Sequence, residues 1–371
     1  MTNTIQDLQK MGQSVWYDNI ARRLLTTGEL QRLIDLGVTG VTSNPSIFEK
    51  AISGSGDYDD DLKALSAKGM DAAAVYERLI LRDISDAADK LLPVYNRTEA
   101  ADGYVSLEPR PALAYDTDGT IKEIRHLNDA LGKRPNVMLK VPGTPAGIPA
   151  VEALISQGIN INITLMFSVG HYEAVSEAYI SGLERLLAAG GDLSRVSSVA
   201  SFFVSRVDTA VDRQLQEIID GGRNDLVSLL GKAGIANAKL AYRRFEEVVR
   251  GDRFMALKAK GARVQRVLWA STSAKNPAYS DVMYVEALAG PDTINTMPAE
   301  TLNAFLDHGL VAPSLREGLD EAERTIEALG ESGIDMNKLT EDLQVEGVRL
   351  FGESLDKLLA GIAEKQRLLA A

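Results

Sequence analysis

The chain contains no cysteine and only three histidines. The absence of cysteine excludes disulfide bonds, thiolate catalysis and cysteine-ligated zinc together. His126, His171 and His308 lie far apart, and none has the spacing of a metal-binding motif such as HExxH. No GxSxG sequence precedes a histidine as a serine hydrolase would require. We therefore expect neither a histidine-built metal site nor a Ser/His/Asp triad.

Long apolar runs and excess positive charge are also missing. No apolar run approaches the roughly 20 residues of a membrane span, and residues 1–14 lack the apolar core of a signal peptide. The cytoplasm is the expected location. The 40 basic and 52 acidic residues give a net charge of −12, which disfavours nucleic acid or an anionic membrane as a partner. Any phosphate must therefore be bound by basic residues gathered locally.

The apolar residues indicate the fold class. The chain is 371 residues long and 45% apolar, and short β-branched runs alternate with longer amphipathic segments, which is typical of an α/β fold with a parallel sheet. The predicted strands are Ser14–Tyr17, Gly40–Thr42, Tyr104–Leu107, Val137–Leu139, Ile159–Ile163, Ser197–Phe202, Val264–Ala270 and Asp292–Asn295. The predicted helices are Gly28–Leu36, Asp71–Leu92, Gly119–Leu131, Gly147–Ser156, Gly170–Ala189, Val207–Asp220 and Ala236–Lys258. Eight such units favour a (β/α)8 TIM barrel, although their number alone leaves a doubly wound sheet open.

Polar residues after the strands favour the barrel. Each predicted strand has one at or close to its carboxyl end: Asp18, Asn44, Glu108, Lys140, Thr164, Ser201, Ser271 and Asn295. The carboxyl ends of barrel strands converge on one face, where barrel enzymes keep their active sites. Residues far apart in sequence are therefore expected to form one compact site.

Two segments exceed a minimal barrel of roughly 250 residues. Residues 53–61 are predicted to be a flexible acidic loop that enters an inserted helical segment. Residues 311–371 are predicted to be a helical extension, in which a long amphipathic helix begins near Leu339 and packs on the outside of the barrel. No internal repeat or linker marks a second domain, so residues 1–371 are expected to form a single domain, as a monomer or homodimer.

Lys140 is the most informative single residue. It follows the apolar run Val137–Leu139, between Pro135 and the turn at Pro142-Gly143. Burying an ammonium group is costly, and burial favours the neutral, nucleophilic amine. We expect the apolar neighbours Val137, Leu139 and Val141 to enclose the amine. A solvated lysine at a strand end is the alternative.

Seven segments together resemble transaldolases of the longer bacterial type. They occur in order between about residues 14 and 300, and they are VWYD at 15–18, TSNPS at 42–46, VSLE at 105–108, MLKVP at 138–142, INITLMFS at 161–168, ASFFVSR at 200–206 and LWASTS at 268–273. The resemblance implies a (β/α)8 fold. It also implies a cofactor-free transferase of the non-oxidative pentose phosphate pathway, which moves a dihydroxyacetone unit from sedoheptulose 7-phosphate to glyceraldehyde 3-phosphate and thereby releases erythrose 4-phosphate and forms fructose 6-phosphate.

The resemblance implies four catalytic residues. Lys140 would form a Schiff base, because a protonated imine accepts the electrons of the broken carbon–carbon bond better than a ketone does. Asp18 would take the proton of the C4 hydroxyl, although an N-cap for the helix that follows is the alternative. Glu108 would move protons through a water held with Thr164. Burial and the neighbouring lysine would shift its pKa in opposite directions, and a surface ion pair with Arg110 is the alternative.

Four further residues are implied to surround the dihydroxyacetone unit. Asn44, Asn162 and Ser201 would bind its hydroxyl groups, because neutral donors and acceptors suit a polyol. Asn44 could equally be only a turn and helix start, and Asn162 a satisfied core amide. Phe203 would form an apolar wall, or simply part of the core.

The phosphate group is implied to bind Arg206 and Ser271. The chain departs from the family pattern two residues after this serine, where many transaldolases have arginine and this sequence has Ser273. Lys275 is close enough in sequence to replace the missing charge, and an uninvolved surface lysine is the alternative.

Three other functions remain to be weighed. An aldolase of the same architecture would release free dihydroxyacetone. A non-catalytic sugar-phosphate binding barrel is disfavoured because Lys140, Asp18, Glu108 and Thr164 are present together. A metal-dependent aldolase is disfavoured by the scattered histidines.

Overall fold

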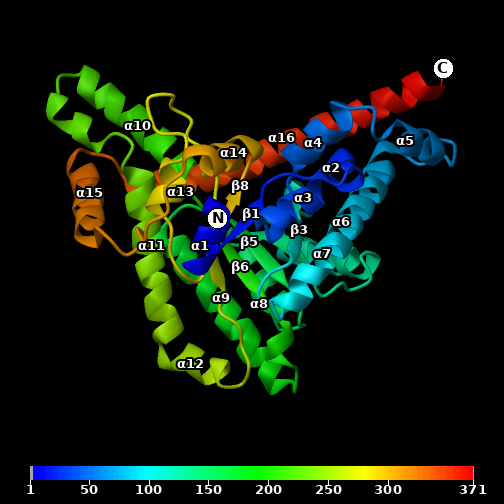
Figure 1. Ribbon diagram of the computed structural model, residues 1–371, viewed down its shortest axis with the longest axis horizontal. Helices are drawn as coiled ribbons and strands as arrows, with labels where there is room; N and C mark the ends of the chain where they lie inside the picture. Colours follow the sequence, from blue (N-terminus) through cyan, green and yellow to red (C-terminus); the bar gives the residue numbers. More distant parts are fainter. Residues whose placement is uncertain (1–2, 371) are drawn as a thin grey trace.

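The computed structural model describes residues 3–370 and contains a closed barrel of eight parallel strands (Figure 1). The strands are β1 Gln13–Tyr17, β2 Gly40–Thr42, β3 Tyr104–Leu107, β4 Val137–Pro142, β5 Ile161–Met166, β6 Ser198–Phe203, β7 Arg266–Ala270 and β8 Thr293–Met297. They follow one another around the barrel in chain order, and β1 pairs with β8. The predicted (β/α)8 barrel is therefore confirmed, and the doubly wound alternative is wrong because no open edge remains in the sheet.

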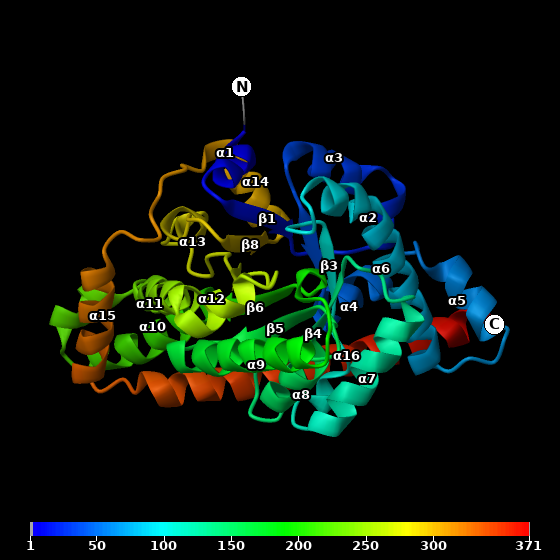
Figure 2. The same ribbon diagram turned by 90° about the horizontal axis from the view of Figure 1, so that it is seen from below.

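Helices alternate with the strands and surround them (Figures 1 and 2). They are α1 Thr4–Lys10, α2 Arg22–Thr26, α3 Glu29–Leu36, α4 Pro45–Ser53, α5 Asp59–Ser66, α6 Ala72–Arg97, α7 Thr117–Ala130, α8 Gly147–Ile155, α9 Val169–Ala188, α10 Ser205–Asp220, α11 Ala233–Arg250, α12 Asp252–Lys258, α13 Met283–Ala287, α14 Ala299–His308, α15 Leu319–Glu331 and α16 Met336–Ala370. The last predicted helix of the barrel is two helices, because Gly251 is extended (φ −66°, ψ 144°) and separates α11 from α12. Within residues 3–370, no helix combines the length and the apolar character needed to cross a membrane.

Strands β4 and β5 extend three residues beyond their predicted ends. Lys140 and Thr164 lie inside β4 and β5, not after them. In the register between these strands, Lys140 faces Asn162 and Pro142 faces Thr164. The Gly143 amide also donates a hydrogen bond to the Thr164 carbonyl (2.7 Å). Pairing with the neighbouring strand therefore continues through residues that look like a turn in the sequence.

Large side chains fill the barrel interior beneath the site. Trp16, Tyr104 and Met138 belong to one buried cluster there. Gly40 makes room for the indole, because a Cβ atom at this position would lie 2.6 Å from the Trp16 ring. The indole nitrogen donates a hydrogen bond to Asp102 (2.7 Å). This packing gives the site a closed floor.

In the C-terminal extension, described to residue 370, α15 packs against α11 on the outside of the barrel, whereas the long helix does not follow the prediction. Its long helix α16 crosses the carboxyl ends of the strands and reaches from α10 and α15 to α4 and α5 (Figure 2). Gln344 Nε2 donates hydrogen bonds to the carbonyl oxygens of Gly143 and Leu165, both at 3.0 Å. A polar side chain thus satisfies two buried carbonyl groups where β4 and β5 end, which holds the helix over the site.

The inserted segment is more helical than predicted, because Ser53 ends α4 and Asp59 already begins α5. The turn between these helices is tied to α16. Lys365 Nζ donates to the carbonyl oxygens of Ile52 (2.9 Å) and Ser55 (2.5 Å). It also lies 3.2 Å from the Asp59 carboxylate.

Candidate active site

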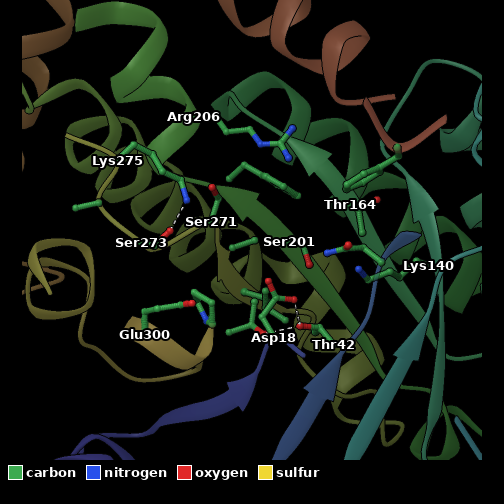
Figure 3. A pocket seen from close by; sticks show the side chains of 18 of the residues that line it. Asp18, Thr42, Lys140, Thr164, Ser201, Arg206, Ser271, Ser273, Lys275 and Glu300 are labelled. Carbon is green, nitrogen blue, oxygen red and sulfur yellow. Dashed lines mark hydrogen bonds between the residues drawn. The ribbon is translucent and has the colours of Figure 1, made fainter. Parts of the chain in front are cut away.

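The carboxyl end of the barrel opens into a cavity of about 520 Å³ (Figure 3). This volume falls in the range of small-molecule sites. The predicted site residues that line it are Asp18, Asn44, Lys140, Thr164, Ser201, Phe203, Arg206, Ser271 and Lys275. Residues spread over most of the sequence thus meet around one space. Of the predicted set, Glu108 and Asn162 lie behind the lining.

Lys140 extends from β4 into the cavity with its side chain only 8% exposed. Its Nζ donates a hydrogen bond to the Ser43 carbonyl oxygen (2.5 Å) and lies 3.6 Å from Glu108 Oε2. The amine therefore has a neutral acceptor in close contact and a carboxylate beyond hydrogen-bond distance.

The apolar neighbours of Lys140 do not enclose its amine, so this expectation is wrong. Val137, Leu139 and Val141 belong to the large cluster between the barrel and its helices, whereas Met138 belongs to the interior cluster. Successive side chains of a strand point to opposite faces. The amine is instead in contact with Ser43, which follows β2, and with Glu108, which follows β3.

Glu108 is 6% exposed, and its Oε2 atom has no hydrogen-bond partner within residues 3–370. Burial raises the pKa of this carboxyl above its usual value, and the charge of Lys140 opposes that shift without cancelling it. Arg110 pairs with Glu123 instead (2.9 Å), so the surface ion pair between Glu108 and Arg110 is absent. Thr164 Oγ1 is a second buried polar atom without a protein partner in the same range.

Asp18 follows β1 and accepts a hydrogen bond from Thr42 Oγ1 (2.7 Å), which is itself 2.6 Å from Thr296 Oγ1. It is not an N-cap, because Ala21 occupies that position before α2. Burial raises the pKa of Asp18, an effect opposed by the charge of Lys140 and by the hydrogen bond from Thr42. The carboxylate is thus oriented at the cavity wall and has an increased affinity for protons.

The three residues predicted to bind hydroxyl groups have different surroundings. Asn44 lines the cavity and also caps α4, since its Oδ1 accepts from the Ile47 amide (3.0 Å). Asn162 is fully buried; it donates to Ser106 Oγ (3.1 Å) and accepts from Ser201 Oγ (2.6 Å). Asn162 thus has the hydrogen bonds that the core-amide alternative expects, and its contact with the substrate stays a prediction. Because Ser201 gives its proton to this amide, its oxygen is left to the cavity as an acceptor.

Two basic side chains, Arg206 and Lys275, lie at the end of the cavity opposite to Lys140 (Figure 3). Arg206, Ser271 and Lys275 lie there, away from Lys140 and Asp18. Lys275 Nζ donates a hydrogen bond to Ser273 Oγ (2.6 Å). Burial lowers the pKa of Lys275, and the charge of Arg206 lowers it further. Although its side chain is exposed overall, Lys275 lines the cavity, and its charge together with that of Arg206 suits an anion.

Similarity to known proteins identifies the family of this chain. The family described as transaldolase/fructose-6-phosphate aldolase matches residues 15–362. The chain belongs to this family of enzymes. A transaldolase of Thiobacillus denitrificans is 49% identical over 361 residues, which cover 97% of this chain and 99% of that protein. Transaldolase 2 of Nostoc sp. is 45% identical over 377 residues, which cover 99% of this chain and 99% of that protein. A transaldolase of Mycolicibacterium smegmatis is 46% identical over 354 residues, with 95% and 94% coverage.

Some cavity residues of this family member were not predicted. Thr42 and Thr296 orient Asp18, and Lys50 and Phe351 also line the cavity. Thr296 lines the cavity and Asn295 does not, because alternate side chains of β8 point to opposite faces and Thr296 shares the inward face with Ile294. This alternation is the signal that could have found Thr296. Phe351 carries no local signal, since it lies far beyond the barrel in sequence.

Proposed function

We propose that the protein is a transaldolase that moves a dihydroxyacetone unit from sedoheptulose 7-phosphate to glyceraldehyde 3-phosphate and forms erythrose 4-phosphate and fructose 6-phosphate. The observation that carries this proposal is the buried Lys140 side chain, which reaches into the cavity. The Asp18 carboxylate lies on the wall of the same cavity, and the cations of Arg206 and Lys275 lie at its far end. The relatives named transaldolase over nearly the whole chain support the same reaction. The proposal includes a cytoplasmic location, a place in the non-oxidative pentose phosphate pathway and no cofactor.

The covalent steps begin from the neutral form of the Lys140 amine, which is the form that can attack a carbonyl carbon. Its nitrogen attacks the C2 ketone carbon of the donor, and the resulting carbinolamine receives a proton and loses water to give a protonated imine. Asp18 then takes the C4 hydroxyl proton while the C3–C4 bond breaks. The bond electrons move to the imine nitrogen and form an enamine, and erythrose 4-phosphate leaves. The enamine carbon next attacks the acceptor aldehyde, whose oxygen receives the proton from Asp18.

Glu108 and Thr164 serve the formation and hydrolysis of the imine. Because burial raises its pKa, the Glu108 carboxyl keeps a proton to a higher pH than an ordinary glutamate and can give that proton to the departing hydroxyl group. Glu108 Oε2 and Thr164 Oγ1 are buried and accept no hydrogen bond from residues 3–370. Buried polar atoms need partners, and in this proposal both bind the water that carries the proton.

The two ends of the cavity match the two ends of a ketose phosphate. Asn44 and Ser201 offer neutral donors and acceptors to the hydroxyl groups near Lys140. Arg206 and Lys275 offer charged donors to the phosphate at the other end, since charge-assisted hydrogen bonds are the strong ones.

Borohydride reduction with fructose 6-phosphate tests the covalent step. Intact-protein mass should show one added dihydroxyacetone unit on the natural chain and none on Lys140→Met, while Lys50→Met, which removes another lysine of the cavity, should keep the adduct. Erythrose 4-phosphate added before reduction should remove the adduct, and free dihydroxyacetone released without an acceptor would indicate an aldolase. A folded natural chain that gains no mass would refute the Schiff-base reaction.

A further inference from the structure

The extension helix α16 contributes directly to the wall of the cavity. Gln344, Gly347 and Phe351 are spaced by three and four residues, so they lie on one face of the helix. Gln344 is hydrogen bonded to the ends of β4 and β5. At Gly347 a Cβ atom would come within 2.7 Å of the Leu165 side chain and 3.6 Å of Arg206 Nη1. The backbone of α16 therefore lies against the barrel at the place where Phe351 enters the cavity lining.

Phe351 meets the arginine at the cationic end of the cavity. The Arg206 guanidinium carbon lies over the Phe351 ring, 5.8 Å from its centre, and over the Phe203 ring, 5.2 Å from its centre. Both distances are within the range of cation–π contacts. Phe203 ends β6 and Phe351 belongs to α16, so the two rings come from elements that only the tertiary fold brings together.

Arg206 is held without an ion pair. Among residues 3–370 it forms no salt bridge, although the charges of Glu108, Glu346 and Asp18 act on it from a distance. Burial lowers its pKa. A carboxylate partner would occupy the N–H donors of the guanidinium group, whereas an aromatic ring contacts its face and leaves the donors at its edge free. Ring contacts can therefore restrict the side chain and still leave it able to bind an anion.

We propose that Phe351 is a positioning residue for phosphate recognition, because its ring orients the Arg206 guanidinium group toward the phosphate of the substrate. The role rests on the proposed function, since it takes a sugar phosphate to be the ligand of this cavity. It makes the C-terminal extension a part of the substrate site, and it concerns affinity for the phosphate group, not the chemistry at Lys140.

The role of Phe351 is tested by substitutions that distinguish the effect of its aromatic ring from the effect of its apolar volume. Phe351→Leu keeps an apolar side chain without a ring, and Phe351→Tyr and Phe351→Trp keep a ring. With saturating donor, Phe351→Leu should raise KM for glyceraldehyde 3-phosphate about 3- to 30-fold. It should leave kcat and the KM for unphosphorylated glyceraldehyde nearly unchanged. Both ring variants should restore most of the affinity.

A double-mutant cycle separates positioning from a general loss of structure. In an Arg206→Met background, Phe351→Leu should cause no further rise in KM for glyceraldehyde 3-phosphate. Additive effects, or equal losses with both acceptors, would overturn the role of Phe351.

Binding measured without turnover separates this role from the reaction itself. Calorimetry on Lys140→Met should show fructose 6-phosphate bound more weakly once Phe351→Leu is added, whatever the outcome of borohydride trapping. Unchanged binding would overturn the role even if the Schiff base is confirmed. Weaker binding together with a failed trapping experiment would refute only the proposed reaction.

Discussion

Replacing Lys275 with methionine should weaken binding of phosphorylated substrates specifically. Its Nζ donates to Ser273, a neutral hydroxyl, and within residues 3–370 it has no carboxylate partner within 4.0 Å. Its charge is therefore available to a phosphate. Methionine has a similar length and removes only the charge and its donors, and in the free protein the substitution also relieves the repulsion between Lys275 and Arg206.

The size of the effect follows from the exposure of the lysine. A hydrogen bond from a charged group contributes about 1.5–3 kcal/mol when well buried. Lys275 is exposed at the cavity mouth, where solvent and salt screen its charge, so about 1–2 kcal/mol is expected. This loss corresponds to a rise in KM of about 5- to 30-fold.

Initial-rate kinetics with two acceptors measure this effect of Lys275→Met. KM for glyceraldehyde 3-phosphate should rise, KM for glyceraldehyde should not, and added salt should reduce the difference from the natural chain. Lys232→Met is the matched control, because Lys232 is exposed and pairs with Glu321 outside the cavity. An equal rise with both acceptors, or no rise with either, would refute the assignment of Lys275 to the phosphate.

Three further predictions concern stability. Burial raises the pKa of Asp208 to about 6, so the folded chain holds a proton that the unfolded chain has released, and this carboxyl lowers stability as pH rises from about 4 to about 6. In urea unfolding, Asp208→Asn should therefore gain about 1.4 kcal/mol relative to the natural chain between pH 5 and 7.5, and a pH-independent difference would contradict this. Gly40→Ala should cost about 1–3 kcal/mol, because the new methyl group overlaps the Trp16 ring, and an unchanged melting temperature would contradict the packing. Arg22→Met should lower the free energy of unfolding by about 3–5 kcal/mol, because it leaves the buried Asp83 carboxylate without its cation. Chemical denaturation that shows no loss of stability would contradict this prediction.

Much of the site could be predicted from the order of residues along the chain. A barrel brings the carboxyl ends of all its strands to one face. Asp18, Lys140 and Ser271 therefore converge although they are far apart in sequence. The prediction needed only the alternation of strands and helices, because barrel closure then determines which ends meet.

The residues that were misplaced depend on contacts with other strands. The predicted ends of β4, β5 and β8 were too early, because hydrogen bonding to a neighbouring strand decides where a strand stops. The apolar residues beside Lys140 face the helices, and its amine is in contact with Ser43 and Glu108. Asn162 lies behind Ser201, and nothing in their own segments distinguishes their depth.

The sequence alone is sufficient to predict the eight strand–helix units and the lysine of the site, and to exclude cysteine chemistry. Each of these depends only on side-chain periodicity or on residue type. The path of α16 and the contact between Phe351 and Arg206 depend on tertiary structure. Amphipathic periodicity shows that a helix has an apolar face but not which surface that face will cover. That choice is made by the buried carbonyl groups and rings at the carboxyl end of the barrel, which exist as one surface only after the barrel has closed.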